Sequence, residues 1–375
     1  MFDFPMKESS IWTSLYCFIF FLIILRSNYR NGLKEPFSRR INIAIRERAY
    51  ILICFFFITH CLLGDFFHFM ENVQEYIFIP GYYNYGEEIY QAIAKFVNKN
   101  YFLFRTIVWG GAFGLFCWTA KRLEVPIYYA VIFLFATHSI IFAYARATAA
   151  MAVYFFGLSF LIKPVTKSKW LGYVVGGFLI YSSCFFHNSA LIMVIMTGII
   201  LVPLRKWNII VIVLMIPFLS IFLKEYLFLF AQETTNETLA AKINNYSERE
   251  IENGISAIII KLFEYLSFYL PFIISSLCIF KKREELVIPS YIYNLYKVTF
   301  GLILVCTTFY FLGESFITFF YRILFMTMIP LSLIVVKLYQ QGLMTLKQYH
   351  YCVIPGFIFL LLRYLYDVYL NYLNL

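Results

Sequence analysis

The sequence predicts an all-α fold, a polytopic bundle of membrane helices that forms a single domain over residues 1–375. Apolar residues make up 62% of the chain and charged residues 14%, and the mean hydropathy is +0.74. A soluble domain is about half apolar and about a quarter charged. One aqueous globule cannot bury this much apolar surface, so we expect the lipid bilayer to surround most of the chain.

About twelve hydrophobic segments follow one another, some of them short or broken. A spanning helix needs about 20 apolar residues. The first segment follows a short polar N-terminus without a small-residue cleavage motif, so we interpret it as a retained anchor. Segment 188–203 follows its predecessor almost without a loop, and we expect a half-helix or a tight hairpin partner there. The segments are 11–25, 48–65, 101–118, 126–143, 147–162, 170–186, 188–203, 208–223, 256–280, 294–312, 316–336 and 350–370.

The loop charges alternate along the chain. Nineteen basic residues fall in one set of alternate loops, and seven fall in the other. The positive-inside rule therefore places both termini outside the cytoplasm. Because the net charge of +10 follows these loops, it does not indicate nucleic-acid binding. The eight cysteines lie in or beside apolar runs without zinc or redox spacing, so we expect buried, small apolar side chains.

Two long loops, about 66–100 and 224–255, fall on the outer face, and both are net acidic. Long loops without obvious secondary structure are often functional. Within the first loop, segment 87–97 is predicted to be an amphipathic helix on the membrane, with an apolar face of Ile89, Ala92, Ile93 and Phe96. Its tyrosines, Tyr85 and Tyr90 among them, suit either stacking on sugar rings or an interfacial aromatic belt.

Arg146 stands alone at the predicted outer face, between two hydrophobic segments. Ala147, Thr148, Ala149 and Ala150 follow it, and such small residues allow another helix or a ligand to approach closely. A guanidinium group offers a permanent charge and a planar fork of donors, which suits phosphate oxygens. The alternative is that the Arg146 side chain snorkels to the membrane–water interface and has no functional role.

His187 lies at a predicted helix boundary on the same side. It can exchange protons near neutral pH, and its alternative is a histidine bonded to a backbone carbonyl. Asn188 and Ser189 suit caps for the next helix. Ser189 and His187 have no identifiable acidic partner for a nucleophilic triad. The other histidines show no metal-ligand spacing with His187, so we predict no metal site.

Arg322 is predicted to lie one to two turns inside the outer end of its span. A charge at that depth needs a wet cavity or a partner. Glu314 lies two turns earlier, so the alternative is an ion pair along one helix face. Asp65, at the outer end of the second span, is similarly ambiguous. Five further charged residues rank lower because their depth is harder to place: Arg105, Lys261, Glu264, Lys297 and Arg363.

These residues resemble a known family. Arg146 with its small-residue helix, the basic loop with Lys163, Lys167 and Lys169, and the run from Phe186 to Ala190 match in order and spacing. The pattern is similar to the EpsG family of bacterial exopolysaccharide polymerases, related in role to the Wzy O-antigen polymerases. Tyr321-Arg322 and the apolar run to Pro330 resemble that family's C-terminal arginine helix. Glu87-Glu88-Ile89-Tyr90 resembles its Glu-Pro-Gly-Tyr element but lacks the Pro and the Gly.

The resemblance is specific over about 146–191, and its layout covers most of the chain. It implies a polymerase that joins undecaprenyl-diphosphate-linked oligosaccharide repeat units at the outer face of the bacterial cytoplasmic membrane, for capsule, O-antigen or exopolysaccharide. Arg146 and Arg322 would bind the diphosphate, and His187, Glu87 or Glu88 would be the general base. The resemblance implies no cofactor. It also implies a flippase and a chain-length regulator as partners.

Three other classes share some of these features. Another lipid-linked glycosyltransferase or ligase would differ in its acceptor. A membrane O-acyltransferase also uses a membrane histidine. A polysaccharide flippase, which is not an enzyme, usually shows internal repeats and charged residues through both leaflets. This chain has no clear repeat and collects its charges at one face, which favours an enzyme.

Overall fold

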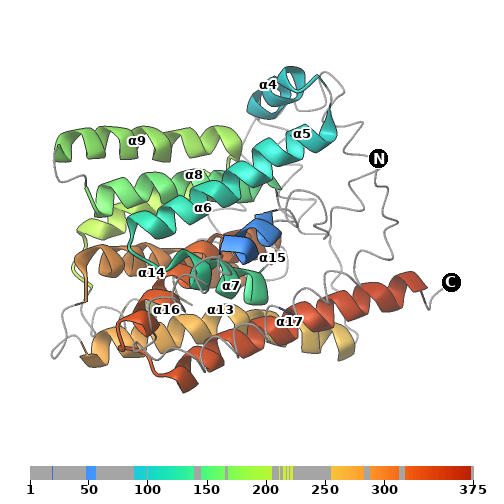
Figure 1. The fold of residues 1–375 in the computed structure, drawn as a ribbon. Helices are drawn as coiled ribbons and strands as arrows, with labels where there is room; N and C mark the ends of the chain where they lie inside the picture. The colour runs from blue at the N-terminus through green and yellow to red at the C-terminus, as the bar shows by residue number, and fades with distance from the viewer. Residues whose placement is uncertain are drawn as a thin grey trace, which may run out of the picture.

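The computed structural model describes residues 48–55, 88–98, 100–138, 145–164, 168–204, 255–282, 288–311 and 317–372, with scattered positions at 19 and between 211 and 222. Every regular element in these ranges is a helix (Figure 1), so the predicted all-α fold is confirmed for them. The predicted segments 11–25 and 208–223, and the second half of 48–65, lie largely outside the described residues.

Most helices of the described N-terminal part form a layer along one side of the bundle, whereas the helix Ile127–His138 packs against the C-terminal helices (Figure 1). A π-helix joins α5 to α6, and a turn of 3₁₀-helix follows α10. The elements are α4 Glu88–Phe96, α5 Tyr101–Arg105, η2 Thr106–Gly110, α6 Gly111–Arg122, α7 Ile127–His138, α8 Ala145–Ile162, α9 Lys169–Phe186, α10 Ala190–Thr197 and η4 Gly198–Leu201.

The C-terminal part forms the opposite side (Figure 1). The predicted span 316–336 is two helices that meet at Thr327, which the continuous apolar run does not reveal. Its elements are α13 Ile255–Lys282, α14 Ser290–Phe311, α15 Ile317–Met326, α16 Met328–Gln340 and α17 Leu346–Tyr372.

Four described helical stretches are long and apolar enough to cross a membrane: Leu103–Arg122, Ile259–Phe280, Ser290–Phe311 and Ile323–Gln340. Ile127–His138, Ala147–Ile162 and Ala190–Leu201 are apolar but shorter. The last of these agrees with the expected half-helix. The membrane class of the fold is therefore supported, while the number of twelve spans stays a prediction.

Local sequence explains where several helices begin and end. Ser168 caps α9, since its side chain accepts a hydrogen bond from the Leu171 N–H. Thr345 and Gln348 form a reciprocal capping box at the start of α17, with the Thr345 N–H 2.8 Å from Gln348 Oε1 and the Gln348 N–H 3.3 Å from Thr345 Oγ1. Gly342 adopts a φ of 69° in the turn after α16, a conformation that favours glycine.

One end of the bundle, here called the basic end, is formed by the ends of α6, α8 and α16 and the start of α14. Glu124, just after α6, joins them. Its carboxylate is 2.6 Å from Lys163 Nζ after α8 and accepts a hydrogen bond from the Tyr291 hydroxyl of α14 at 3.0 Å. Lys337 of α16 donates to the Glu124 carbonyl at 2.7 Å. Since α8 and the continuous helical stretch α5–η2–α6 both end here, both begin at the opposite end, here called the site end.

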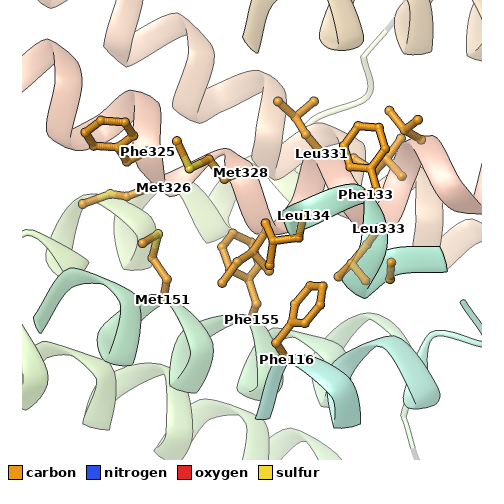
Figure 2. Packing of buried hydrophobic residues seen from close by; sticks show 14 of the residues in the cluster. Phe116, Phe133, Leu134, Met151, Phe155, Phe325, Met326, Met328, Leu331 and Leu333 are labelled. Carbon is orange, nitrogen blue, oxygen red and sulfur yellow. The ribbon is translucent and has the colours of Figure 1, made fainter. Parts of the chain in front are cut away.

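The core lies between the two layers (Figure 2). Phe133 and Leu134 of α7 and Phe155 of α8 pack against Leu331 and Leu333 of α16, and all five side chains are at most 1% exposed. Gly157 of α8 and Gly176 of α9 bring these two helices into backbone contact. A Cβ atom added at Gly157 would lie 2.9 Å from the Gly176 carbonyl oxygen. The close approach of α8 to α9 therefore lies at Gly157, about two turns after the small residues 147–150 that follow Arg146.

Candidate functional site

Arg146 is the second residue of α8, which begins at the site end. Its side chain lies outside the described residues. The small residues after it are buried, with Thr148, Ala149 and Ala150 at most 4% exposed. Their role in a close approach of a helix or a ligand stays a prediction, since the backbone contact of α8 with α9 lies further along, at Gly157.

His187 ends α9 at the site end, as predicted. It has an extended backbone, and its N–H donates to the Ser183 carbonyl at 3.3 Å. The His187 carbonyl accepts from the Ala190 N–H at 2.9 Å, which closes the turn into α10. The imidazole is half-buried. The expectation that Ser189 caps α10 through its side chain is wrong, because no such hydrogen bond forms and the Ser189 hydroxyl is buried without a partner among the described residues.

An aromatic cluster joins three site-end elements. Tyr90 of α4 is 3% exposed, and its ring centroid lies 6.4 Å from that of Phe104 in α5 and 6.2 Å from that of Phe186 in α9. Glu88, the first residue of α4, therefore begins a helix that packs beside the turn at His187. The Glu88 side chain itself lies outside the described residues. Tyr90 packs helices together here, and sugar stacking by its ring stays a prediction.

The predicted amphipathic helix in the first outer loop is confirmed as α4. Its protein-facing side is formed by Tyr90, Ala94 and Val97, each at most 4% exposed. Of the predicted apolar face, Phe96 is 81% exposed. One side of the helix therefore packs against the protein, and another side carries the exposed Phe96 side chain. The contact of this helix with a membrane stays a prediction.

Arg105 is a buried charged residue at the same end, and it was among the lower-ranked candidates from the sequence. Its side chain is 6% exposed, and its guanidinium carbon lies 5.6 Å from the Trp109 ring centroid. It directly precedes the π-helix. Single π turns within α-helices are frequent at functional sites. The signal in the sequence was an arginine at the fifth position of the apolar segment that begins at Tyr101. The depth of that arginine depends on the π turn that follows it.

A second polar group in the site-end half lies between α13, α15 and α17. Glu264 of α13 is 9% exposed and interacts electrostatically with Tyr321 of α15. Tyr321 and Tyr265 have their hydroxyl oxygens 3.3 Å apart. Antiparallel packing places this group away from the basic end, because Tyr265 pairs with Tyr310 near the end of α14 whereas Phe280 pairs with Tyr296 near its start.

Arg322 follows Tyr321 in α15, and its side chain lies outside the described residues. The remaining predicted site residues, Glu87, Tyr85, Asp65 and Glu314, also lie outside them, so their roles stay predictions. In the part of the chain that the structure describes, no group of three or more His, Cys, Asp or Glu side chains is placed to hold a metal ion.

At the basic end, the charged side chains that the structure describes include Glu124, paired with Lys163, and Arg122, which bonds to neutral groups. Hydrogen bonds from Lys163 and Tyr291, and the Lys163 charge, hold the pKa of the Glu124 carboxyl below its ordinary value. Arg122 donates to Ser159 Oγ at 3.0 Å and to the Lys163 carbonyl at 2.8 Å, and its guanidinium lies 3.7 Å from the Phe160 ring centroid. These contacts join α6 to α8, a structural arrangement.

The fold and the site end thus define a class, an α-helical membrane protein with a polar site at one end of its bundle. The chain matches the EpsG family over residues 64–374, which is most of its length. It therefore belongs to the EpsG family, a Wzy-like polymerase family, and the resemblance found in the sequence is confirmed. No curated protein and no solved structure matches the chain.

Proposed function

We propose that this protein joins undecaprenyl-diphosphate-linked oligosaccharide repeat units into a polysaccharide at the outer face of the bacterial cytoplasmic membrane. The observation that carries the proposal is the convergence of α8 with Arg146, the His187 turn and α4 with Glu88 at one end of the bundle. Membership of the EpsG family supports it. The basic end would face the cytoplasm, as the positive-inside rule requires.

The register of two helices supports a shared diphosphate site for Arg146 and Arg322. Helices α8 and α15 are in contact, and Met326 of α15 lies beside Met151 of α8 (Figure 2). Arg322 is one helical turn before Met326 in α15, toward the site end, and Arg146 is five residues before Met151 in α8, so the two arginine positions lie at a similar level along the bundle, although Arg146 is about 140° around α8 from Met151. Two guanidinium groups in this region would neutralise the charge that develops on the diphosphate leaving group.

The reaction also requires a base. The acceptor hydroxyl oxygen attacks the anomeric carbon of the donor sugar, the bond from that carbon to the diphosphate oxygen breaks, and undecaprenyl diphosphate leaves. A general base takes the hydroxyl proton. His187, Glu87 and Glu88 are the candidates, because the Tyr90–Phe186 contact holds the start of α4 near the His187 turn.

The first prediction tests this function directly. In a strain lacking the chromosomal gene, the wild-type protein restores polymer, whereas Arg146→Ala and His187→Ala leave lipid-linked single repeats to accumulate. The general base alone contributes about 100-fold or more to such a transfer, so we expect polymer to be nearly absent. Gel separation of glycans and quantification of lipid-linked repeats provide the measurement.

Lys95→Ala is the matched control, because Lys95 is a basic residue on the exposed side of α4 at the same end. It should restore polymer at the wild-type level. All variants must be present in the membrane in equal amounts. Normal polymer in the strain without the gene would contradict the proposal, as would transfer of an acyl group or of a finished chain to another acceptor.

A further inference from the structure

The Ser189 hydroxyl lies beside the His187 turn at the site end, and its Oγ atom is buried without a hydrogen-bond partner among the described residues. Most buried polar groups in native proteins have a partner, and leaving one without a partner costs free energy. A buried group that stays unsatisfied therefore needs an explanation, and a role in catalysis or in ligand binding is one of the few available.

The turn into α10 does not use this hydroxyl. A serine that caps a helix has an extended backbone, and its Oγ accepts a hydrogen bond from an N–H two or three residues later. Ser189 instead has a helical backbone, with φ of −64° and ψ of −15°. The N–H groups of residues 190–192 donate to the backbone carbonyls of residues 187–189 at 2.9–3.1 Å. The hydroxyl is therefore not required to close the turn.

Ser189 lies at the same level along the bundle as Arg146. Helices α8 and α10 both begin at the site end and are in contact, and the Tyr154 hydroxyl of α8 lies 2.8 Å from Thr197 Oγ1 of α10. Arg146 and Ser189 each precede their member of this pair by eight residues, which is about 12 Å along each helix. The two positions are therefore level in neighbouring helices.

His187 falls at this level too. Helices α8 and α9 run in opposite directions, and their backbones touch at Gly157 and Gly176. Arg146 is eleven residues before Gly157, and His187 is eleven residues after Gly176, which is about three turns in each helix. The Ser189 hydroxyl is therefore level with the backbone positions of two residues that the proposed function uses.

We propose that the Ser189 hydroxyl donates a hydrogen bond to a diphosphate oxygen of the lipid-linked donor. A serine hydroxyl has one proton to donate, and its O–H bond can rotate toward a phosphate oxygen that enters at this level. Hydrogen bonds to charged acceptors such as phosphate are the stronger ones. Binding of the donor gives the hydroxyl the partner that the turn does not supply. This inference rests on the proposed function in taking a diphosphate as the group that binds here.

The experiment measures binding of undecaprenyl diphosphate to the purified full-length protein in lipid nanodiscs. Ser189→Ala should weaken this binding about tenfold or more, the effect of losing one hydrogen bond to a charged group. In the absence of the ligand, the melting temperature of Ser189→Ala should equal or exceed that of the wild-type protein, because the variant removes a buried hydroxyl that has no partner. A serine that stabilises the fold would give a lower melting temperature instead.

Ser183→Ala is the matched control. Ser183 is a buried serine about one turn before His187 in α9, and its hydroxyl donates to the Ile180 carbonyl at 2.6 Å. Because that hydroxyl already has a partner, Ser183→Ala should bind undecaprenyl diphosphate like the wild-type protein. Undecaprenol has the same lipid chain but no diphosphate, so the wild-type protein and Ser189→Ala should bind it equally well.

Four results would overturn the inference: wild-type affinity in Ser189→Ala, an equal loss of affinity in Ser183→Ala, an equal loss of affinity for undecaprenol, or a lower melting temperature of Ser189→Ala without ligand. A wild-type protein that does not bind undecaprenyl diphosphate would contradict both this inference and the diphosphate substrate of the proposed function. Normal polymer in the strain without the gene would contradict the proposed function alone, because the binding measurement does not depend on polymer.

Discussion

The two ends of the bundle are stabilised by different kinds of interaction. At the basic end, Glu124 bonds to side chains from α8, α14 and α16, and Arg122 joins α6 to α8. At the site end, helices are interrupted by a π turn and by the His187 turn. Buried charge occurs in both halves, with Arg105 and Glu264 toward the site end and Lys337 at the basic end, but Lys337 donates to the Glu124 carbonyl and so joins two elements of the scaffold. Interrupted helices are expected where a protein needs chemistry more than rigidity.

This comparison predicts that changes to the scaffold lower the stability and leave the activity of each folded molecule unchanged. Changes at the site end should lower the activity and leave the stability unchanged, which Arg146→Ala and His187→Ala test. The following three changes test the prediction for the scaffold.

The largest loss is expected for Gly157→Ala, at the contact of α8 with α9. The new Cβ would lie 2.8 Å from Leu179 Cβ and 2.9 Å from the Gly176 carbonyl oxygen, so the two backbones must separate. Overpacking of this kind costs about 1–3 kcal/mol or more. Thermal unfolding of the detergent-solubilised protein measures it.

Gly177→Ala is the matched control, because nothing lies within 4 Å of its added Cβ. Replacing a helical glycine with alanine in open space should raise the free energy of unfolding by about 0.5–1 kcal/mol. Equal melting temperatures for the two variants would show that α8 and α9 are not in backbone contact.

An intermediate loss is expected for Arg122→Met. The variant loses two hydrogen bonds and the contact with the Phe160 ring, which together should cost about 2 kcal/mol. Lys121→Met, on the exposed side of the same helix, should change the stability little. The amount of polymer made per folded molecule should be the same in both variants. A loss of activity per folded molecule in Arg122→Met alone would contradict the assignment of stability to the basic end and activity to the site end.

The smallest effect is expected for Glu124→Gln, because the Glu124 side chain is 64% exposed and exposed ion pairs contribute less than about 1 kcal/mol. The pKa of Glu124 is lowered in the folded protein. Its stabilising contribution is therefore fully present above the ordinary glutamate pKa of about 4.3, and is lost as the pH falls through the lower, folded value. The melting temperatures of wild type and variant should differ at neutral pH and converge in acid. A constant difference would rule out titration of Glu124 as its source.

The sequence was sufficient for features that depend on local composition. Uniform apolar runs predicted α8 and α9 within a few residues of their ends. The resemblance to the EpsG family, inferred from Arg146 and the run at His187, is confirmed by the family match over residues 64–374. The break at Thr327 was not predictable, since the apolar run continues through it.

Glu264 shows why part of the site could not be predicted. Its partner Tyr321 is 57 residues away along the chain, so only the packing of α13 against α15 reveals the pair. Arg105 was similarly hard to place, because the π turn that follows it changes the side of the helix on which it lies. How deep a residue of a membrane helix lies, and which side of the helix it is on, depend on the helices packed around it, and apolar periodicity does not identify those helices.

That π turn has a consequence for how this helix tolerates insertions and deletions. A π-helix contains one residue more per turn than the α-helix around it, so it amounts to a one-residue insertion between Arg105 and Gly111. Removing one residue there would restore a regular α-helix and rotate everything before it by about 100°. Phe104 would then leave the side of the helix that meets Tyr90. The length of this segment is therefore under as strong a constraint as its composition.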